Sequence, residues 1–454
     1  MVSPDGRVVA EAEAPVHPRV TGDGGVEQDP EELWQSVLEA GRRACAEARV
    51  PIGAMGLANQ GETVLAWERA SGRPLSPAIS WQDRRALPIC DAMDGHAEWL
   101  RAHTGLPLDP YFAAPKMRWL REHVTGAGVC TTTDAWLIHR LCGAFVSDAA
   151  TASRTLLLDL DAGAWSAAAA ALFAIDPETL PAIVPCAGAV GETTAFGDTL
   201  ALTGLAVDQQ AALFGEDCLS PGDAKCTYGT GAFLLATVGP RAQRSTAGLV
   251  ACVAWQLGGT TTYCLDGQVY TVGAALNWLQ SVGLMDGPQD LDRLGGAARD
   301  AGGAVFVPAL AGLAAPFWRP AARGVLSGFS LSTSREQLVR AVVDGIAAQV
   351  AWLAHAAAAD LGSALTRLRV DGGLTRSRLL MQVQADLLQA PVEVYPSPHA
   401  TALGVAAFAR LGAGGARDVG GWQPAAVYEP QIGGDEAAAR LQRWRAVAEA
   451  TMEL

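Results

Sequence analysis

The chain has 454 residues, of which 50% are apolar and 18% are charged, and its net charge is −14. This composition excludes a largely disordered chain, and the acidic balance excludes a general nucleic-acid binder. Nine cysteines without paired metal-ligand spacing predict reduced thiols. Since no uninterrupted apolar run reaches the roughly 18 residues of a membrane helix, we expect a cytoplasmic protein with no membrane partner.

The first half of the chain alternates predicted strands and helices. The sequence Asp29-Pro30-Glu31-Glu32 is typical of a helix N-terminus and predicts a helix that ends near Ala48. We expect strands at residues 7–14, 52–58, 63–67, 77–81, 154–160 and 202–207. Helical spacing is found at residues 115–122 and 134–142.

The second half repeats the alternation. Strands are predicted at residues 224–228, 232–237, 304–308, 365–370 and 392–394. Helices are predicted at residues 268–279, 337–359, 376–388, 402–410 and 436–450. This order predicts an α/β protein of two related domains with a cleft between them. We expect the domains to span residues 1–216 and 217–412, followed by a tail, 413–454, with one helix.

Three local patterns carry possible chemistry. Asp208 follows the apolar run 202–207, at the strand end where open α/β sheets bind ligands, although Asp at a helix start can equally be an N-cap. Gly229-Thr230-Gly231 can present N–H groups and a hydroxyl to phosphate, or form an ordinary hairpin turn. Asp371-Gly372-Gly373 can bring backbone close to a ligand, or form a tight turn. Each pattern is weak alone, but their order along one chain is hard to explain by coincidence.

With its other motifs, the chain resembles the FGGY family of carbohydrate and polyol kinases, within the superfamily of sugar kinases, heat-shock chaperone ATPases and actin. Within that family it is most similar to the glycerol kinases, over residues 2–412. The resemblance rests on Asn59-Gln60-x-Glu62-Thr63, Ile79-x-Trp81-Gln82-x-Arg84-Arg85, Asp109-Pro110-Tyr111-Phe112, Lys116-x-x-Trp119-Leu120, Asp134-x-Trp136-Leu137-Ile138, Ala152-Ser153-Arg154-Thr155, Gly204-x-x-x-Asp208-Gln209-Gln210, Tyr228-Gly229-Thr230-Gly231, Pro308-Ala309-x-x-Gly312-Leu313, Val370-Asp371-Gly372-Gly373 and Thr401-Ala402-Leu403-Gly404.

The resemblance implies two ribonuclease H-like (actin-like ATPase) domains around a catalytic cleft, with ATP and Mg²⁺ as cofactors. It implies that Asp208 is the general base for the substrate hydroxyl and helps to hold Mg²⁺. It implies that a small polyol or sugar, with glycerol as the first guess, contacts Glu62, Trp81, Tyr111, Asp208 and Gln209. It implies that the nucleotide contacts Gly229, Thr230, Gly273, Asn277, Gly373 and Ser377. The family includes dimers and tetramers, so either homo-oligomer is open.

Two departures from the family pattern bear on function. Glycerol kinases have Arg where this chain has Gly61, and glycine removes the hydrogen-bond donors and is expected to open space. Losing a hydrogen bond to a charged partner costs about 1.5–3 kcal/mol, so we expect weak glycerol binding unless another side chain fills in. The family also begins with a strand, an Asp-x-Gly-Thr-like phosphate turn and a second strand. That hairpin of roughly twenty residues is expected to be missing from the first domain here.

Three functional readings follow. The first is an ATP-dependent kinase of a small polyol or sugar, glycerol first. The second is a kinase of another polyol or a ketose, which Gly61 motivates. The third is a sugar- or nucleotide-binding protein without catalysis, which the missing hairpin motivates. The expected absence of the hairpin has two possible explanations. Either the start codon is assigned too far downstream, or the polypeptide is inactive as written.

Overall fold

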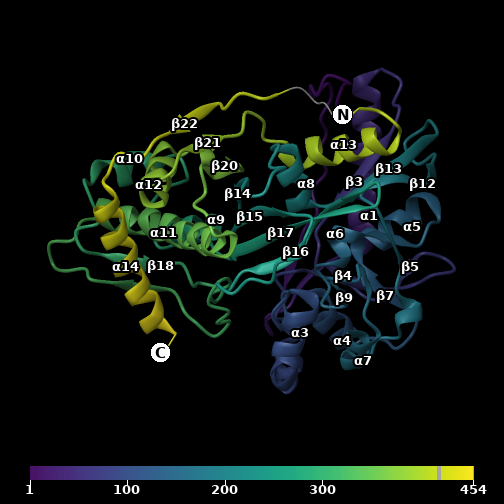
Figure 1. Ribbon diagram of the computed structural model, residues 1–454, viewed down its shortest axis with the longest axis horizontal. Coiled ribbons are helices and arrows are strands. Elements are labelled where there is room, and N and C mark those ends of the chain that lie inside the picture. Colours follow the sequence, from purple (N-terminus) through teal and green to yellow (C-terminus); the bar gives the residue numbers. More distant parts are fainter. Residues whose placement is uncertain (417–420, 453–454) are drawn as a thin grey trace.

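Two α/β lobes follow one another along the chain (Figure 1). The computed structural model describes residues 1–416 and 421–452. In the first lobe the strands and helices are β1 (Arg19–Val20), β2 (Val26–Gln28), α1 (Pro30–Ala48), β3 (Met55–Asn59), β4 (Val64–Glu68), β5 (Arg73–Pro74), β6 (Ala78–Ile79), α2 (Leu87–Ala92), α3 (Ala97–Thr104), α4 (Ala113–His123), β7 (Val129–Thr132), α5 (Thr133–Cys142), β8 (Val146–Asp148), α6 (Ala149–Ala152), β9 (Leu158–Asp159), β10 (Ala164–Trp165), α7 (Ala167–Leu172), β11 (Ala182–Val184), β12 (Ala187–Thr193), β13 (Leu200–Val207) and α8 (Asp208–Gly215).

The second lobe is built in the same alternating way. Its elements are β14 (Ala224–Tyr228), β15 (Ala232–Gly239), β16 (Val250–Leu257), β17 (Thr260–Val269), α9 (Gly273–Ser281), α10 (Asp290–Ala297), β18 (Val305–Val307), β19 (Val325–Ser327), α11 (Arg335–Leu361), β20 (Leu368–Asp371), α12 (Arg378–Leu388), β21 (Val392–Val394), α13 (Ala400–Gly412), β22 (Ala426–Tyr428) and α14 (Gly434–Thr451). The predicted α/β class is confirmed, and the predicted bounds of α1, β14 and β21 match the observed elements.

Each lobe contains a central sheet with a parallel pair. The second-lobe sheet has the order β16-β17-β15-β14-β20-β21-β22, and a first-lobe sheet has the order β12-β13-β3. Strand β3 is parallel to β13, as β20 is parallel to β21. In the second lobe β14 continues the sheet beyond β20, whereas β3 is an edge strand among the residues that the structure describes. The carboxyl ends of β3 and β13 therefore lie side by side at one edge, where loops can gather functional groups.

Helices pack on the sheets of both lobes, and one second-lobe helix packs on the first lobe. Helix α13 comes late in the chain, yet it packs on β13, β3 and α8 of the first lobe (Figure 1). Glycines permit this close packing, because a Cβ at Gly404 would meet the backbone oxygen of Ala211 at 1.7 Å. The largest hydrophobic cluster extends from the second-lobe sheet and α11 into β13 and α8. The two lobes thus share a continuous core.

Helix α11 is the central helix of the second lobe. Ser334 and Gln337 form a capping box at its start, and most of its residues are buried. By length and composition alone it could cross a membrane, but 78% of its most apolar window is buried inside the protein. It therefore serves as a core helix here.

Four predicted elements are wrong or incomplete. Residues 7–14 form no strand, and Val8 makes only an isolated bridge to Val2. The β-like stretch 154–160 shortens to β9. Residues 268 and 269 are not helical: they end strand β17, which pairs with β15 and β16, and α9 begins only at Gly273. The tail supplies β22 to the second-lobe sheet as well as α14.

A buried carboxyl group in the first lobe is expected to make the stability of the protein depend on pH. Asp134, in the first turn of α5, accepts a hydrogen bond from Ser147 at 2.5 Å, and its Oδ1 has no partner among the described residues. Burial, helped by the nearby Asp148, raises the pKa of Asp134 to about 6. The native state therefore binds more protons than the unfolded chain between about pH 4 and 6, and stability falls as pH rises through that window.

We expect Asp134→Asn to remove this pH dependence, because the amide stays neutral. Relative to the wild type, its free energy of unfolding should rise from pH 4 to pH 7 by about 1–3 kcal/mol. Chemical denaturation at several pH values measures the difference. Asp435→Asn, at an exposed position of α14, is the matched control. A stability difference that is the same at pH 4 and pH 7 would contradict this account.

Candidate active site

Asp208 lies where the parallel strands of the first lobe end. Val207 is in register with Asn59, so the chain leaves β13 and β3 at the same edge and places Asp208 close to Glu62. Asp208 is the first residue of α8, and no side chain caps this helix. Its Oδ1 accepts a hydrogen bond from the backbone N–H of the adjacent Gln209 at 2.8 Å. The N-cap interpretation of Asp208 is therefore wrong: Val207 is the N-cap, and Asp208 lies in the first turn.

The surroundings of Asp208 favour proton uptake near neutral pH. Burial, and next the charge of Glu62, raise the pKa of the Asp208 carboxyl to about 6. The ammonium of Lys225 acts in the opposite direction. Carboxylates with raised pKa values are typical of groups that accept or donate protons in enzymes.

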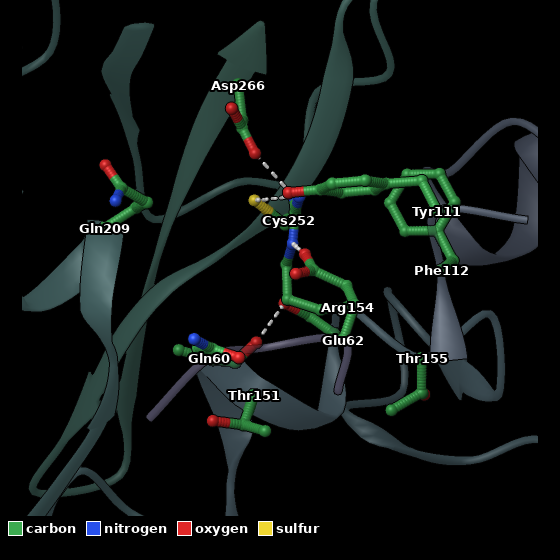
Figure 2. Close-up of polar contacts among 12 residues, drawn as sticks. Gln60, Glu62, Tyr111, Phe112, Thr151, Arg154, Thr155, Gln209, Cys252 and Asp266 are labelled. Atoms are coloured by element: carbon green, nitrogen blue, oxygen red, sulfur yellow. Dashed lines mark hydrogen bonds and ion pairs between the residues drawn. The ribbon is translucent and has the colours of Figure 1, made fainter. Parts of the chain in front are cut away.

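A buried ion-pair network joins the two lobes next to Asp208. Arg154 follows the short helix α6 and lies between Glu62 and Asp266 in Figure 2. Its Nε donates to Glu62 at 2.7 Å, and one terminal nitrogen donates to Asp266 of β17 at 2.6 Å. All three residues are at least 95% buried. Because Glu62 is in the first lobe and Asp266 in the second, Arg154 ties the lobes together.

Aromatic rings from both lobes surround this network. The Tyr111 ring lies 5.7 Å from the Arg154 guanidinium and 5.8 Å from the ring of Trp81. Trp81 in turn contacts Phe233 of the second lobe edge-to-face, at 5.8 Å. Burial, and next the charge of Glu62, raise the pKa of Tyr111 well above its usual value, so its hydroxyl stays neutral. The structure thus groups the predicted polyol residues Glu62, Trp81 and Tyr111.

Two buried lysines order the loops around these residues. Lys116 donates to the carbonyl oxygens of Pro110 at 2.9 Å, Phe112 at 2.7 Å and also Tyr111. Lys225 of β14 donates to Gln209 at 2.6 Å and to Thr227 at 2.7 Å. Gln209, the fifth predicted polyol residue, is therefore fixed by the second lobe.

The glycine turn of the second lobe lies at the meeting of three segments. The N–H of Gly273, at the start of α9, donates to the carbonyl of Gly229 at 3.0 Å. A Cβ at Gly273 would lie 2.7 Å from that oxygen, so only glycine allows the approach. Gly372 has φ of 95° and lies against the backbone of Tyr228 in the same way. The structure therefore brings Gly229, Thr230, Gly273 and Gly373 together.

One face of this glycine turn is accessible to solvent. Thr230 and Gly373 are exposed, and the nearest atom to a Cβ at Gly373 would be an Arg376 side-chain nitrogen at 3.7 Å. Such a turn can present backbone N–H groups to phosphate oxygens. Asn277, on α9, is also exposed.

Ser377 is already hydrogen-bonded within the protein. Its hydroxyl donates to Asp292 and accepts from the N–H of Leu380 at 3.1 Å, capping α12. A nucleotide contact by Ser377 remains a prediction, and it has to compete with these bonds.

The space that we expected beside Gly61 is not present. A Cβ at Gly61 would lie 2.6 Å from Val207 Cγ2 and 3.3 Å from Arg154 Cγ. Two other side chains thus occupy the position, and one of them is an arginine. The expectation of open space is wrong. That another side chain supplies the missing hydrogen-bond donors stays a prediction, because the guanidinium of Arg154 is paired with Glu62 and Asp266.

The sequence analysis assigned no role to Arg154, Lys225 or Asp266. Arg154 belongs to a family motif, which was a usable signal. The scarcity of lysine was a second signal, since Lys116 and Lys225 are the only two in the chain and both are fully buried. Asp266 carried no signal, because its partner lies in the other lobe.

Comparison with known proteins gives concordant matches. The model of the FGGY family of carbohydrate kinases, N-terminal domain, matches residues 1–215, and the C-terminal domain model matches residues 224–413. The chain is 43% identical to a glycerol kinase of Bordetella parapertussis (94% of this chain, 89% of that protein) and 41% identical to one of Thermus brockianus (98% and 94%).

Solved structures agree with the sequence matches. A Plasmodium falciparum glycerol kinase with ADP superposes with a TM-score of 0.91 at 29% identity, over 99% of this chain and 95% of that one. A xylulose kinase from Brucella ovis superposes with a TM-score of 0.87 at 25% identity, over 99% and 96%.

We expect Arg154→Met to destabilise the protein strongly. Removing the guanidinium leaves Glu62 and Asp266 buried without their cation, and breaking a buried ion pair costs about 3–5 kcal/mol. Chemical denaturation measures the loss, with the exposed Arg443→Met as matched control. Adding Glu62→Gln and Asp266→Asn to Arg154→Met should restore part of the stability. If Arg154→Met is as stable as the wild type, the network does not hold the lobes.

Proposed function

The chain belongs to the FGGY family of carbohydrate kinases, and we propose that it transfers the γ-phosphate of ATP to a hydroxyl of a small polyol, with glycerol as the first substrate. The observation that carries this proposal is the position of Asp208, at a strand edge beside the buried polar cluster of Glu62, Arg154 and Tyr111. Similarity to glycerol kinases over most of the chain supports glycerol.

Asp208 acts as the general base in this proposal. Its carboxylate accepts the proton of the attacking hydroxyl while the phosphoryl group transfers in line. Glu62 and Gln209 orient the hydroxyls. Arg154 holds Glu62 in place, and Lys225 holds Gln209. The rings of Trp81 and Tyr111 cover the carbon chain and exclude water.

The nucleotide lies on the second-lobe side. We place its phosphates against the turn of Gly229, Thr230 and Gly373, of which Thr230 and Gly373 are exposed. Gly273 lets α9 approach that turn, and Asn277 and Ser377 face the rest of the nucleotide.

Mg²⁺ fits this arrangement through few protein ligands. Among the described residues no three His, Cys, Asp or Glu side chains gather into a metal site. Mg²⁺ in kinases is commonly held by one or two carboxylates plus substrate phosphates, and Asp208 would supply the carboxylate. When bound, the ion neutralises charge on the phosphates.

The competing function is phosphorylation of a different polyol or a ketose. The absence of arginine donors at Gly61 motivates it, although Val207 and Arg154 leave no extra room there, and a panel of polyols and ketoses separates the two readings.

We expect the 454-residue chain to form ADP in the presence of ATP, Mg²⁺ and glycerol, in a coupled assay. Asp208→Asn should lower kcat by about 10²- to 10⁴-fold, because the amide cannot accept the proton. The exposed Asp198→Asn is the matched control and should retain activity. Lack of turnover with every polyol and ketose would refute the proposed function and favour a non-catalytic binding protein.

We expect Gly61→Arg to leave the KM for glycerol no lower than in the wild type, because Val207 and Arg154 occupy the position. Crowding in a packed region should also destabilise the variant by about 1–3 kcal/mol. Steady-state kinetics and thermal unfolding measure both effects. Val207→Ala added to Gly61→Arg should recover stability. A lower KM for the single variant would show that the missing arginine limits glycerol binding.

A further inference from the structure

Strand β17 presents a row of polar side chains to the first lobe. Side chains two apart share a face of a strand, so Asp266 and Gln268 point the same way, and Tyr270 follows directly after the end of β17 at Val269. Asp266 meets Arg154 of the first lobe at 2.6 Å. The ring of Tyr270 lies 4.4 Å from the guanidinium of Arg84, also of the first lobe. Gln268 stands between these two contacts, so it too faces the boundary between the lobes.

Gln268 is fully buried, and the charged group beside its amide is the carboxylate of Asp266, whose pKa burial raises and the amide helps to lower. Its relative exposure is 0%, and neither Nε2 nor Oε1 makes a hydrogen bond among the described residues. Two other buried glutamines are each bonded through one amide atom: Gln384 accepts from Tyr228 at 2.7 Å, although its Nε2 has no partner, and Gln210 donates to Cys252. Burying an amide without hydrogen bonds is unfavourable, and natural proteins usually satisfy such groups. The Oδ1 atom of the neighbouring Asp266 also has no partner.

Gln268 is the cross-strand neighbour of a residue that contacts Trp81 of the candidate site. Gln268 is directly opposite Phe233 in the β15–β17 register, and Phe233 contacts Trp81. Thr227 continues the same face on β14, next to Phe233. Lys225, two residues earlier on β14, bonds Gln209. Gln268 therefore belongs to the second-lobe face that carries the Lys225 and Phe233 contacts to the predicted polyol residues.

The chemistry of this group suits a neutral hydroxyl. A primary amide offers both donors and an acceptor, as a hydroxyl offers both functions. The nearby guanidinium of Arg154 is already paired with two carboxylates, Glu62 and Asp266, so it is not free to bind an anion.

We propose that Gln268 is a substrate-binding residue, whose amide hydrogen-bonds a hydroxyl of the polyol, and that this site selects uncharged polyols over the corresponding acids. The inference rests on the proposed function and extends the polyol site onto β17. The resemblance to known kinases assigned no role to this position.

Gln268→Met tests the proposal, because methionine is similar in length and lacks the amide. We expect the KM for the preferred polyol to rise about tenfold, as for loss of one or two neutral hydrogen bonds, with kcat within about twofold of the wild type. Without substrate, the variant should be close to the wild type in stability, because the protein itself gives the amide only its contact with Asp266. The increase in melting temperature that saturating polyol gives the wild type should shrink. Gln35→Met, at an exposed position of α1, is the control.

Several outcomes would overturn the proposal. One is an unchanged KM and an unchanged polyol-dependent thermal shift in Gln268→Met. Another is a fall in melting temperature without substrate, which indicates a structural role. Equal turnover of glycerol and glycerate by the wild type would overturn the selectivity for uncharged substrates. If the wild type turns over no polyol, the proposed kinase function fails, while the polyol-dependent thermal shift still decides whether Gln268 binds a hydroxyl.

Discussion

The buried contact of Arg154 with Glu62 and Asp266 is the interaction on which the site depends. Charges at least 95% buried are costly unless they are paired with good geometry, and here one guanidinium serves one carboxylate from each lobe. The network therefore fixes Glu62 next to Asp208 and, at the same time, sets the distance between the first-lobe loops and β17. Tyr111 and Phe112 pack their rings close to the same guanidinium, which excludes water.

Both lobes share one structural feature. A parallel strand pair ends at the lobe boundary, β13 with β3 in the first lobe and β14 with β20 in the second. The first pair carries carboxylates and the second carries glycine turns. Carboxylates suit proton transfer from a hydroxyl, and exposed backbone N–H groups suit phosphates. In the proposed function, the polyol therefore binds at the first strand end and the nucleotide at the second.

The chain contains two lysines, and both are buried in the protein interior. Lys116 fixes the backbone around Tyr111, and Lys225 fixes Gln209. Each ammonium is bonded to the protein's own oxygens, so neither is a free positive charge for an anionic substrate. Together with the paired state of Arg154, this balance fits a neutral polyol, and the buried amide of Gln268 has the chemistry to bind one.

The sequence by itself determined the α/β class, the family, helix α1 with its Asp29 cap, and Asp208 with the glycine turns, because these signals are local and lie within short motifs. It could not determine β17, where residues 268 and 269 have helical spacing but gain strand pairing on two sides. Nor could it assign Arg154 or Lys225, or show that Val207 and Arg154 fill the space beside Gly61. Only the tertiary structure decides such contacts, because the partner of a buried charge or amide lies far away in sequence. The energy of each contact also depends on how deeply it is buried, which no local sequence pattern shows.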